Sequence, residues 1–108
     1  MEIPARKFKI LFLCTRNASR SIFAEYFMKD IGSDRFGTFS AGVTPIGQVS
    51  PLTLRVLQDK FRIDASGARS KSWEEFKDEH FDFVVSVSEQ AERRVMRFRV
   101  NRYSAHWP

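Results

Sequence analysis

The sequence predicts a single α/β domain, built as a four-stranded parallel sheet flanked by helices. Residues 8–13 (Phe-Lys-Ile-Leu-Phe-Leu) are almost all apolar, as expected for a strand that is covered on both faces of a parallel sheet. Segments with helical spacing of apolar residues alternate with further strand-like segments, which indicates strand–helix–strand units. With 108 residues, 43% of them hydrophobic, the chain is expected to form one small packed domain over residues 1–108.

The first helix is expected from about Ser19 to Ile31. Phe23, Phe27 and Ile31 recur at helical spacing, so we expect this stripe to face the core. Gly32 follows as a stop signal. A short second strand is expected at Thr38–Gly42, before a loop.

The second helix has a clear start signal. Ser50 is the expected cap and Pro51 the first helical residue. The apolar stripe of this helix consists of Leu54, Leu57 and Phe61. Residues 62–71 show little periodicity and are expected to form a loop.

The last third of the chain predicts a short helix, a strand, a helix and a strand. Residues 72–75 (Ser-Trp-Glu-Glu) match a capping box and open the short helix, which ends near His80. The third strand is expected over Phe81–Ser88, a helix over residues 89–98, and the fourth strand over Tyr103–Trp107.

Composition argues against several functional classes. No apolar run is long enough to cross a membrane, and the first seven residues lack the apolar core of a signal peptide, so a cytoplasmic protein is expected. The single cysteine excludes an internal disulfide, and one cysteine with two histidines argues against a structural zinc site. The net charge of +5 suits an anionic ligand.

Arginine is densest near the carboxyl terminus. We interpret this stretch as a solvated helix face and the loop after it, in preference to a nucleic-acid or phosphoprotein surface. Its members are Arg93, Arg94, Arg97, Arg99 and Arg102.

The candidate site lies where the first strand meets the first helix. Cys14 follows the strand, and the five residues between it and Arg20 are enough to curl the chain round a tetrahedral oxyanion. Free N–H groups at the helix start would cradle the anion, and the Arg20 guanidinium would bind two of its oxygens. The same surroundings favour a reactive thiolate, to which Ser21 could donate a hydrogen bond. The alternative is that Cys14 is a buried small hydrophobe.

Here the sequence resembles the low-molecular-weight tyrosine phosphatases and the related arsenate reductases. The resemblance rests on Cys14-Thr-x-Asn17-x-x-Arg20-Ser21, followed by Ala24-Glu25. Further segments favour the arsenate-reductase branch and extend the likeness over nearly the whole chain from Phe8. These segments are Phe39–Gly42, Arg69–Trp73, Asp82–Val85 and His106–Pro108.

The resemblance implies a role for each loop residue. Cys14 would be the nucleophile, with Arg20 and Ser21 also catalytic. The oxyanion would be bound by Thr15, Arg16, Asn17, Ala18, Ser19 and Arg20. Loop support would come from Asn17, Glu25, Ser40 and Lys71. Other readings are a surface charge for Glu25, a buried strand serine for Ser40 and a solvent-facing lysine for Lys71.

The resemblance also bears on cofactors. No metal and no bound cofactor are expected. Some arsenate reductases hold a potassium ion beneath the loop, and Lys71 takes the place of an acidic residue there, so no potassium dependence is expected.

The sequence departs from the family at points that bear on mechanism. Ser88 stands where a relay cysteine is expected, so arsenate reduction would need an external thiol, such as glutathione or mycothiol with a glutaredoxin-type partner. The family's general-acid aspartate and last helix would lie beyond Pro108, which implies a carboxyl-terminally short domain, either truncated or degraded. Glu89, at the carboxyl end of the third strand, is a possible surrogate acid.

Two departures lie within the loop itself. Arg16 replaces a usual glycine, and if a left-handed residue is needed there, it costs about 1 kcal/mol or more. Ser19 replaces a cysteine that often partners the nucleophile.

Three functions stay open at this point. The first is an arsenate reductase in which Cys14 attacks arsenate and an external thiol completes the reduction. The second is a protein-tyrosine phosphatase that hydrolyses phosphomonoesters through a cysteinyl phosphate. The third is an inactive module that binds phosphate or another oxyanion. All three predict phosphate, arsenate or a phosphomonoester as ligand, and none calls for a membrane or a nucleic acid.

Overall fold

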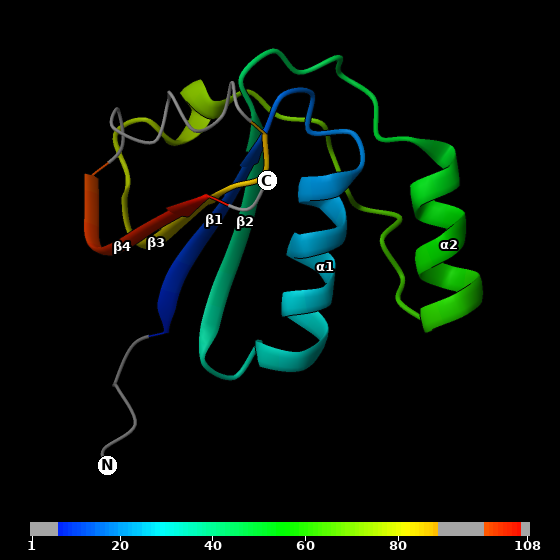
Figure 1. The fold of residues 1–108 in the computed structure, drawn as a ribbon. Coiled ribbons are helices and arrows are strands. Elements are labelled where there is room, and N and C mark those ends of the chain that lie inside the picture. The colour runs from blue at the N-terminus through cyan, green and yellow to red at the C-terminus, as the bar shows by residue number, and fades with distance from the viewer. Residues whose placement is uncertain (1–6, 89–98, 107–108) are drawn as a thin grey trace.

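The computed structural model describes residues 7–88 and 99–106 and confirms the predicted fold class. Its four strands are all parallel and lie in the order β2-β1-β3-β4. The strands are β1 (Phe8–Cys14), β2 (Phe36–Gly42), β3 (His80–Ser86) and β4 (Arg99–His106). The helices are α1 (Arg20–Gly32), α2 (Pro51–Phe61) and the short 3₁₀ helix η1 (Trp73–Phe76) (Figure 1).

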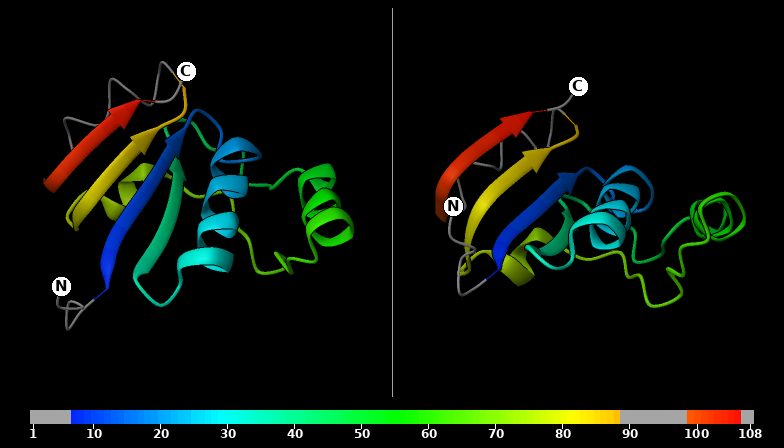
Figure 2. Two further views of the ribbon diagram at one scale, coloured as in Figure 1. Left: turned by 60° about the horizontal axis from the view of Figure 1, so that its bottom comes forward. Right: turned by 90° about the horizontal axis from the view of Figure 1, so that it is seen from below.

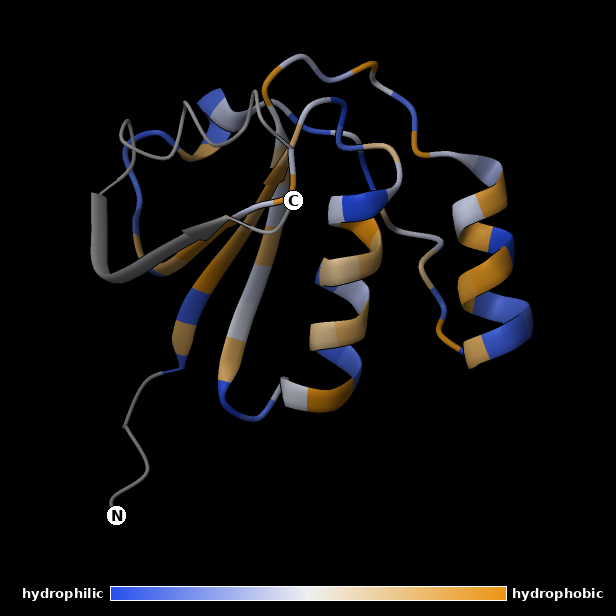
Figure 3. Cartoon of the chain, viewed as in Figure 1, coloured by the Kyte–Doolittle hydropathy of each residue, from blue (hydrophilic) through white to orange (hydrophobic). Residues whose placement is uncertain are grey.

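Helices lie on both sides of the sheet. On one face, Leu11 and Leu13 of β1 pack in a cluster with Phe81 and Val84 of β3, and the aromatic side chains of η1 cover this cluster. On the other face α1 lies against the strands, and α2 lies farther from the sheet, beyond α1 (Figure 2). Hydrophobic residues concentrate in the central strands, and the turn between α1 and β2 is hydrophilic (Figure 3).

The buried side of α1 differs from the predicted stripe. Ile22 is fully buried, and Glu25 is buried with it one turn later, whereas Ile31 is 77% exposed. Ile31 lies nine residues beyond Ile22, which is two and a half turns of helix, so it emerges on the opposite side. Phe27 is half-buried and packs edge-on against Phe61 of α2, with ring centroids 4.8 Å apart.

The start of α2 agrees with its prediction. The Ser50 hydroxyl accepts from the backbone N–H of Thr53 at 3.5 Å, and Pro51 is the first helical residue. Leu57 is fully buried, while Phe61 at the end of the stripe is 49% exposed. The boundaries of β1, α1 and β2 lie within two residues of those expected.

Three boundaries in the last third differ from the prediction. The short helix ends at Phe76, because a single 3₁₀ turn is followed by the turn into β3. β3 ends at Ser86, and β4 begins at Arg99, so Arg99 and Arg102 lie on a strand instead of on a helix face or in a loop. The helix predicted over residues 89–98, the candidate acid Glu89 and residues 107–108 lie outside the described residues.

Among the helices of the described ranges, none has both the length and the apolar character needed to span a membrane.

Candidate active site

The thiol of Cys14 lies in a polar shell at the carboxyl end of β1. The side chain is 4% exposed, and its sulfur accepts a hydrogen bond from the backbone N–H of Asn17 at 2.9 Å. The Ser21 hydroxyl lies 2.8 Å from the same sulfur. A small hydrophobe buried at a strand end would not need these partners, so the geometry favours the reactive alternative for Cys14.

The loop from Cys14 to Arg20 is held from outside through its carbonyl oxygens. The oxygens of Cys14 and Thr15 accept N–H bonds from the segment after β2, at 3.0 and 2.7 Å. The oxygen of Ala18 accepts from the Ser50 N–H at 2.9 Å, and that of Arg16 from the Ser70 hydroxyl at 2.8 Å. Because these carbonyls are occupied by neighbouring segments, the loop is left with N–H groups to offer an anion.

Asn17 fixes the curvature of the loop. Its φ of 52° lies in the left-handed region, which asparagine tolerates better than most residues. Arg16 has no positive φ, so the backbone cost expected at that position falls on Asn17 instead. A Cβ on Gly42 would lie 2.9 Å from backbone atoms of both Arg16 and Asn17, so the end of β2 must be glycine for the loop to pack on it.

The side chain of Asn17 connects the loop to two other segments. Its Oδ1 accepts from the Lys71 backbone N–H at 2.7 Å. Its Nδ2 donates to the hydroxyls of Ser21 at 2.7 Å and of Ser40 at 3.0 Å. Because Ser21 Oγ already receives this bond, its own hydrogen is available for the Cys14 sulfur.

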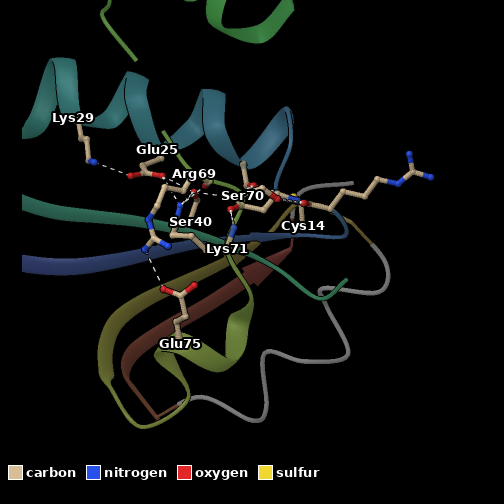
Figure 4. Close-up of polar contacts among 11 residues, drawn as sticks. Cys14, Glu25, Lys29, Ser40, Arg69, Ser70, Lys71 and Glu75 are labelled. Atoms are coloured by element: carbon tan, nitrogen blue, oxygen red, sulfur yellow. Dashed lines mark hydrogen bonds and ion pairs between the residues drawn. The ribbon is translucent and has the colours of Figure 1, made fainter. Parts of the chain in front are cut away.

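A buried charge network lies beneath the loop (Figure 4). The Ser40 hydroxyl donates to Glu25 Oε1 at 2.5 Å, and Lys71 Nζ lies 3.7 Å from the same oxygen. Lys71 Nζ also donates to the Arg69 carbonyl at 2.8 Å, and Lys29 pairs with Glu25 Oε2 at 2.7 Å. Glu25 and Lys71 are only 6% and 8% exposed, so the surface-charge and solvent-facing alternatives are wrong.

Burial lowers the pKa of the Lys71 ammonium group below its ordinary value, although the Glu25 carboxylate opposes this shift. The lowering follows from desolvation, which disfavours the charged form of a lysine. Desolvation is therefore the largest influence on this group, and the Glu25 carboxylate offsets part of it.

The loop lines a solvent-open pocket of about 470 Å³. Its lining residues are Cys14, Thr15, Arg16, Ala18, Ser19 and Arg20. These are six of the residues predicted to form the site, and the buried Asn17, Ser21, Glu25, Ser40 and Lys71 lie behind them. No group of three or more His, Cys, Asp or Glu side chains suited to a metal occurs within residues 7–88 and 99–106.

Sequence reasoning missed several residues that hold the loop. Thr53 donates to the Ser19 hydroxyl at 3.1 Å, and the Thr15 hydroxyl donates to Ser88 at 3.0 Å. Ser70 binds the Arg16 carbonyl, and Gly42 makes room for the loop. Only Gly42 carried a usable signal, because a glycine at the carboxyl end of the neighbouring strand suggests close backbone approach.

Comparisons with known proteins bear on the family and the fold of this chain. The family model for low molecular weight phosphotyrosine protein phosphatases matches residues 9–107. A glutaredoxin arsenate reductase from Synechocystis sp. is 33% identical over 79 residues, which are 73% of this chain and 59% of that protein. This chain therefore spans less than two thirds of the length of that relative.

Two solved structures show the same fold. An arsenate reductase in its phosphate-binding state is 28% identical with a TM-score of 0.79, and the match covers 93% of this chain and 75% of that one. A low molecular weight protein tyrosine phosphatase from T. tengcongensis is also 28% identical, with a TM-score of 0.72 and coverage of 83% and 65%.

Proposed function

The chain belongs to the low molecular weight phosphotyrosine protein phosphatase family, and on this premise we propose that it reduces arsenate, with Cys14 as nucleophile and an external thiol as reductant. The similarity to arsenate reductases in both sequence and structure supports this branch. The observation that carries the proposal is the Cys14 sulfur, bonded by the Asn17 N–H and by Ser21 at the base of a pocket that two arginines line.

This arrangement suits attack on a tetrahedral oxyanion. The Asn17 N–H and the Ser21 hydroxyl lie within hydrogen-bond distance of the sulfur, where they can stabilise the charge of the attacking nucleophile. The thiolate forms an S–As bond, and one arsenate oxygen leaves as water after protonation. Arg20 and the loop N–H groups stabilise the charge on the remaining oxygens.

The reducing equivalents must come from outside the chain, since Cys14 is its only cysteine. An external thiolate attacks the Cys14 sulfur and forms a disulfide with it. The S–As bond breaks, its electron pair stays on arsenic, and arsenite is released. The resulting mixed disulfide is exchanged by a second external thiol, and Cys14 returns to its thiol form. The balance is one arsenate and two thiols converted to one arsenite, one disulfide and water. A low-molecular-weight thiol and a glutaredoxin-type protein are the partners this sequence of steps needs.

Phosphatase activity is the second candidate, and the match to the phosphatase from T. tengcongensis favours it. The same nucleophile would form a cysteinyl phosphate, which water then hydrolyses. Release of an alcohol or phenol from phosphorus requires a proton donor, and an enzyme without one loses about 100- to 10,000-fold in rate. Glu89 remains the proposed donor for this reaction.

We assign positioning roles to the residues beneath the loop. Asn17, Ser40, Glu25 and Lys71 would hold the loop in its curled form without touching the substrate. The Lys71 ammonium group, 3.7 Å from Glu25, would supply a fixed positive charge there, which supports independence from potassium.

The test compares arsenate reduction and hydrolysis of p-nitrophenyl phosphate by the wild-type chain, the Cys14→Ser variant and the remote control Arg35→Gln. Arsenate reduction is followed with glutathione and glutaredoxin, through NADPH consumption by glutathione reductase. We expect reduction in the wild type and the control, and a loss of at least about 1,000-fold in Cys14→Ser. Hydrolysis without reduction would assign the phosphatase branch. Oxyanion binding without either activity would leave an inactive binding module.

A further inference from the structure

We propose that Arg16 forms a second anion subsite at the rim of the pocket, which binds a carboxylate on the molecule that meets Cys14. This inference rests on the proposed function, because it assumes that an oxyanion occupies the loop. It extends that function by naming the chemistry of the rest of the substrate, or of the thiol that reduces it.

The backbone of Arg16 is fixed on its inner side. Its carbonyl oxygen accepts from Ser70 at 2.8 Å, and the ideal Cβ position on Gly42 lies 2.9 Å from the Arg16 carbonyl carbon. Neighbouring chain therefore covers the inner side of this residue, and its side chain leaves on the solvent side and is exposed. Arg16 is among the residues that line the pocket, and its long exposed side chain starts beside the buried Cys14, so the guanidinium can reach a ligand that extends out of the loop.

Arg16 adds a guanidinium to a pocket in which the motif already assigns Arg20 to the oxyanion. Arg16 and Arg20 both line it, and the lining residues within the described part of the chain include no carboxylate. Within that part, neither guanidinium has an ion-pair partner. The nearest acidic group of the network, Glu25, is buried and already paired with Lys29 and Lys71. A second negative group on the ligand would give the Arg16 guanidinium an ion-pair partner.

The size of the pocket supports a ligand larger than the oxyanion. The pocket of about 470 Å³ opens to solvent, and a tetrahedral oxyanion has only five heavy atoms, so the anion alone does not fill it. An arsenate or phosphate bound over Cys14 would leave the rim of the pocket open. The part of the ligand beyond the oxyanion would meet Arg16 there.

A carboxylate is the group that an arginine at this position recognises best, because the planar guanidinium presents paired N–H donors that match its two oxygens. Two ligands of the proposed reactions could carry it. One is a carboxylate-bearing thiol that attacks the Cys14–arsenic adduct, and the other is a phosphomonoester with a carboxylate near the phosphate.

Binding is tested first, in the Cys14→Ser background so that no turnover occurs. The probes are 3-phosphonobenzoate and its carboxamide, which differ only in the second charge, and affinity is measured by calorimetry. We expect the carboxylate probe to bind about 5- to 10-fold more tightly than the amide, as for one solvent-exposed charge-assisted pair. Arg16→Gln should reduce this ratio to below about 2, Arg16→Lys should give an intermediate ratio, and Arg35→Gln should leave it unchanged.

Turnover then distinguishes the two sources of the carboxylate. With arsenate as substrate, the rates with 3-mercaptopropionate and with 2-mercaptoethanol are compared in the wild type and in Arg16→Gln. A ratio that falls in the variant assigns the subsite to the reducing thiol. The hydrolysis rates of 3-carboxyphenyl phosphate and of its carboxamide are compared in the same two proteins. If only this second ratio falls in the variant, the subsite belongs to the phosphomonoester.

The outcomes separate this inference from the proposed function. If both phosphonates bind and Arg16→Gln weakens them by the same factor, the subsite is disproved while the oxyanion site stands. If neither phosphonate binds to the protein with Arg16 intact, the oxyanion site itself is disproved, and the subsite is disproved with it.

Discussion

At the scale of single residues, Asn17 connects the nucleophile to the rest of the molecule. The Lys71 N–H fixes the orientation of its amide, and the amide in turn donates to Ser21, whose hydrogen is then available for the Cys14 sulfur. The sequence motif predicted that Asn17 belongs to the loop. It did not indicate that the asparagine binds a backbone N–H 54 positions later, because no local pattern encodes that pairing.

Replacement of Asn17 should destabilise the fold as well as the site. Asn17→Ala removes a fully buried amide, leaves the Lys71 N–H without an acceptor, and places alanine at a φ of 52°. We expect the free energy of unfolding to fall by about 2–4 kcal/mol, from an unpaired buried donor and the left-handed backbone together. Urea denaturation measures this change.

Asn17→Gly separates the two contributions. Glycine tolerates the positive φ and lacks the amide, so this variant should recover about 1 kcal/mol relative to Asn17→Ala. The exposed Gln58→Ala serves as the control. Equal stability of Asn17→Ala and the wild type would contradict the supporting role assigned to this side chain.

Lys71 should give the stability of the protein a characteristic pH dependence. Its pKa is lowered by burial from an ordinary value of 10.5, so the folded state loses this proton at a lower pH than the unfolded state. Between the lowered value and 10.5, the unfolded state binds more protons, and the free energy of unfolding gains a contribution that rises with pH. Below this window the contribution is unfavourable and constant.

The measurement compares the wild type with Lys71→Met by urea denaturation from pH 7 to 10.5. The unfolding free energy of the wild type minus that of Lys71→Met should increase as the pH rises. The control is Lys77→Met, which removes the same charge from an exposed lysine directly after η1. This variant should show no such trend. A shift in the opposite direction would mean that the Glu25 attraction outweighs desolvation.

At the scale of elements, the sequence predicts best where the signal is local. β1 is apolar along its length, and the start of α2 is marked by Ser50 and Pro51, so both are found where expected. The prediction fails for Ile31, since apolar spacing alone does not say which side of α1 meets the sheet. That side is set by Glu25, a charged residue buried by partners on β2 and on residues 69–71.

The end of β2 offers a test of how tightly the elements fit together. Gly42→Ala would place a Cβ 2.9 Å from the backbone of Arg16 and Asn17, and neither can move without opening the loop. We expect the variant to lose about 1–3 kcal/mol of stability, as in other overpacked cores, and to bind phosphate less tightly. Urea denaturation and calorimetry measure the two effects.

Gly67→Ala is the matched control for this substitution. A Cβ at Gly67 meets no atom within 4 Å, and its φ is not positive, so stability should change by no more than about 0.5 kcal/mol. If both alanine variants behaved alike, close packing of β2 against the loop would not be the reason for glycine at position 42.

At the scale of the whole molecule, the site is assembled by the parallel sheet. β1 and β2 end at the same edge, and residues 69–71 return to that edge through a bridge between Gly42 and Ser72. The motif from Cys14 to Ser21 was predictable because it is continuous in sequence. The contribution of Ser70 and Thr53 was not, since it depends on how distant segments meet after folding.

Occupation of the loop by phosphate should stabilise the whole fold. The loop, β2 and residues 69–71 are joined by hydrogen bonds, so an anion that binds only the folded state should raise the unfolding temperature. At a phosphate concentration 100 times the dissociation constant, the expected gain is about 2.7 kcal/mol. Thermal unfolding with and without phosphate measures it, and Arg20→Ala should abolish most of the gain while Arg35→Ala should keep it.

The same experiment tests whether Lys71 makes a monovalent cation unnecessary. Its ammonium group lies 3.7 Å from Glu25 and donates to the Arg69 carbonyl, so the position beneath the loop already holds a positive charge. Replacing sodium with potassium at constant ionic strength should therefore change neither the unfolding temperature nor the affinity for phosphate in the wild type. A stabilisation specific to potassium would show that Lys71 leaves room for an ion, and that the ammonium group does not serve in its place.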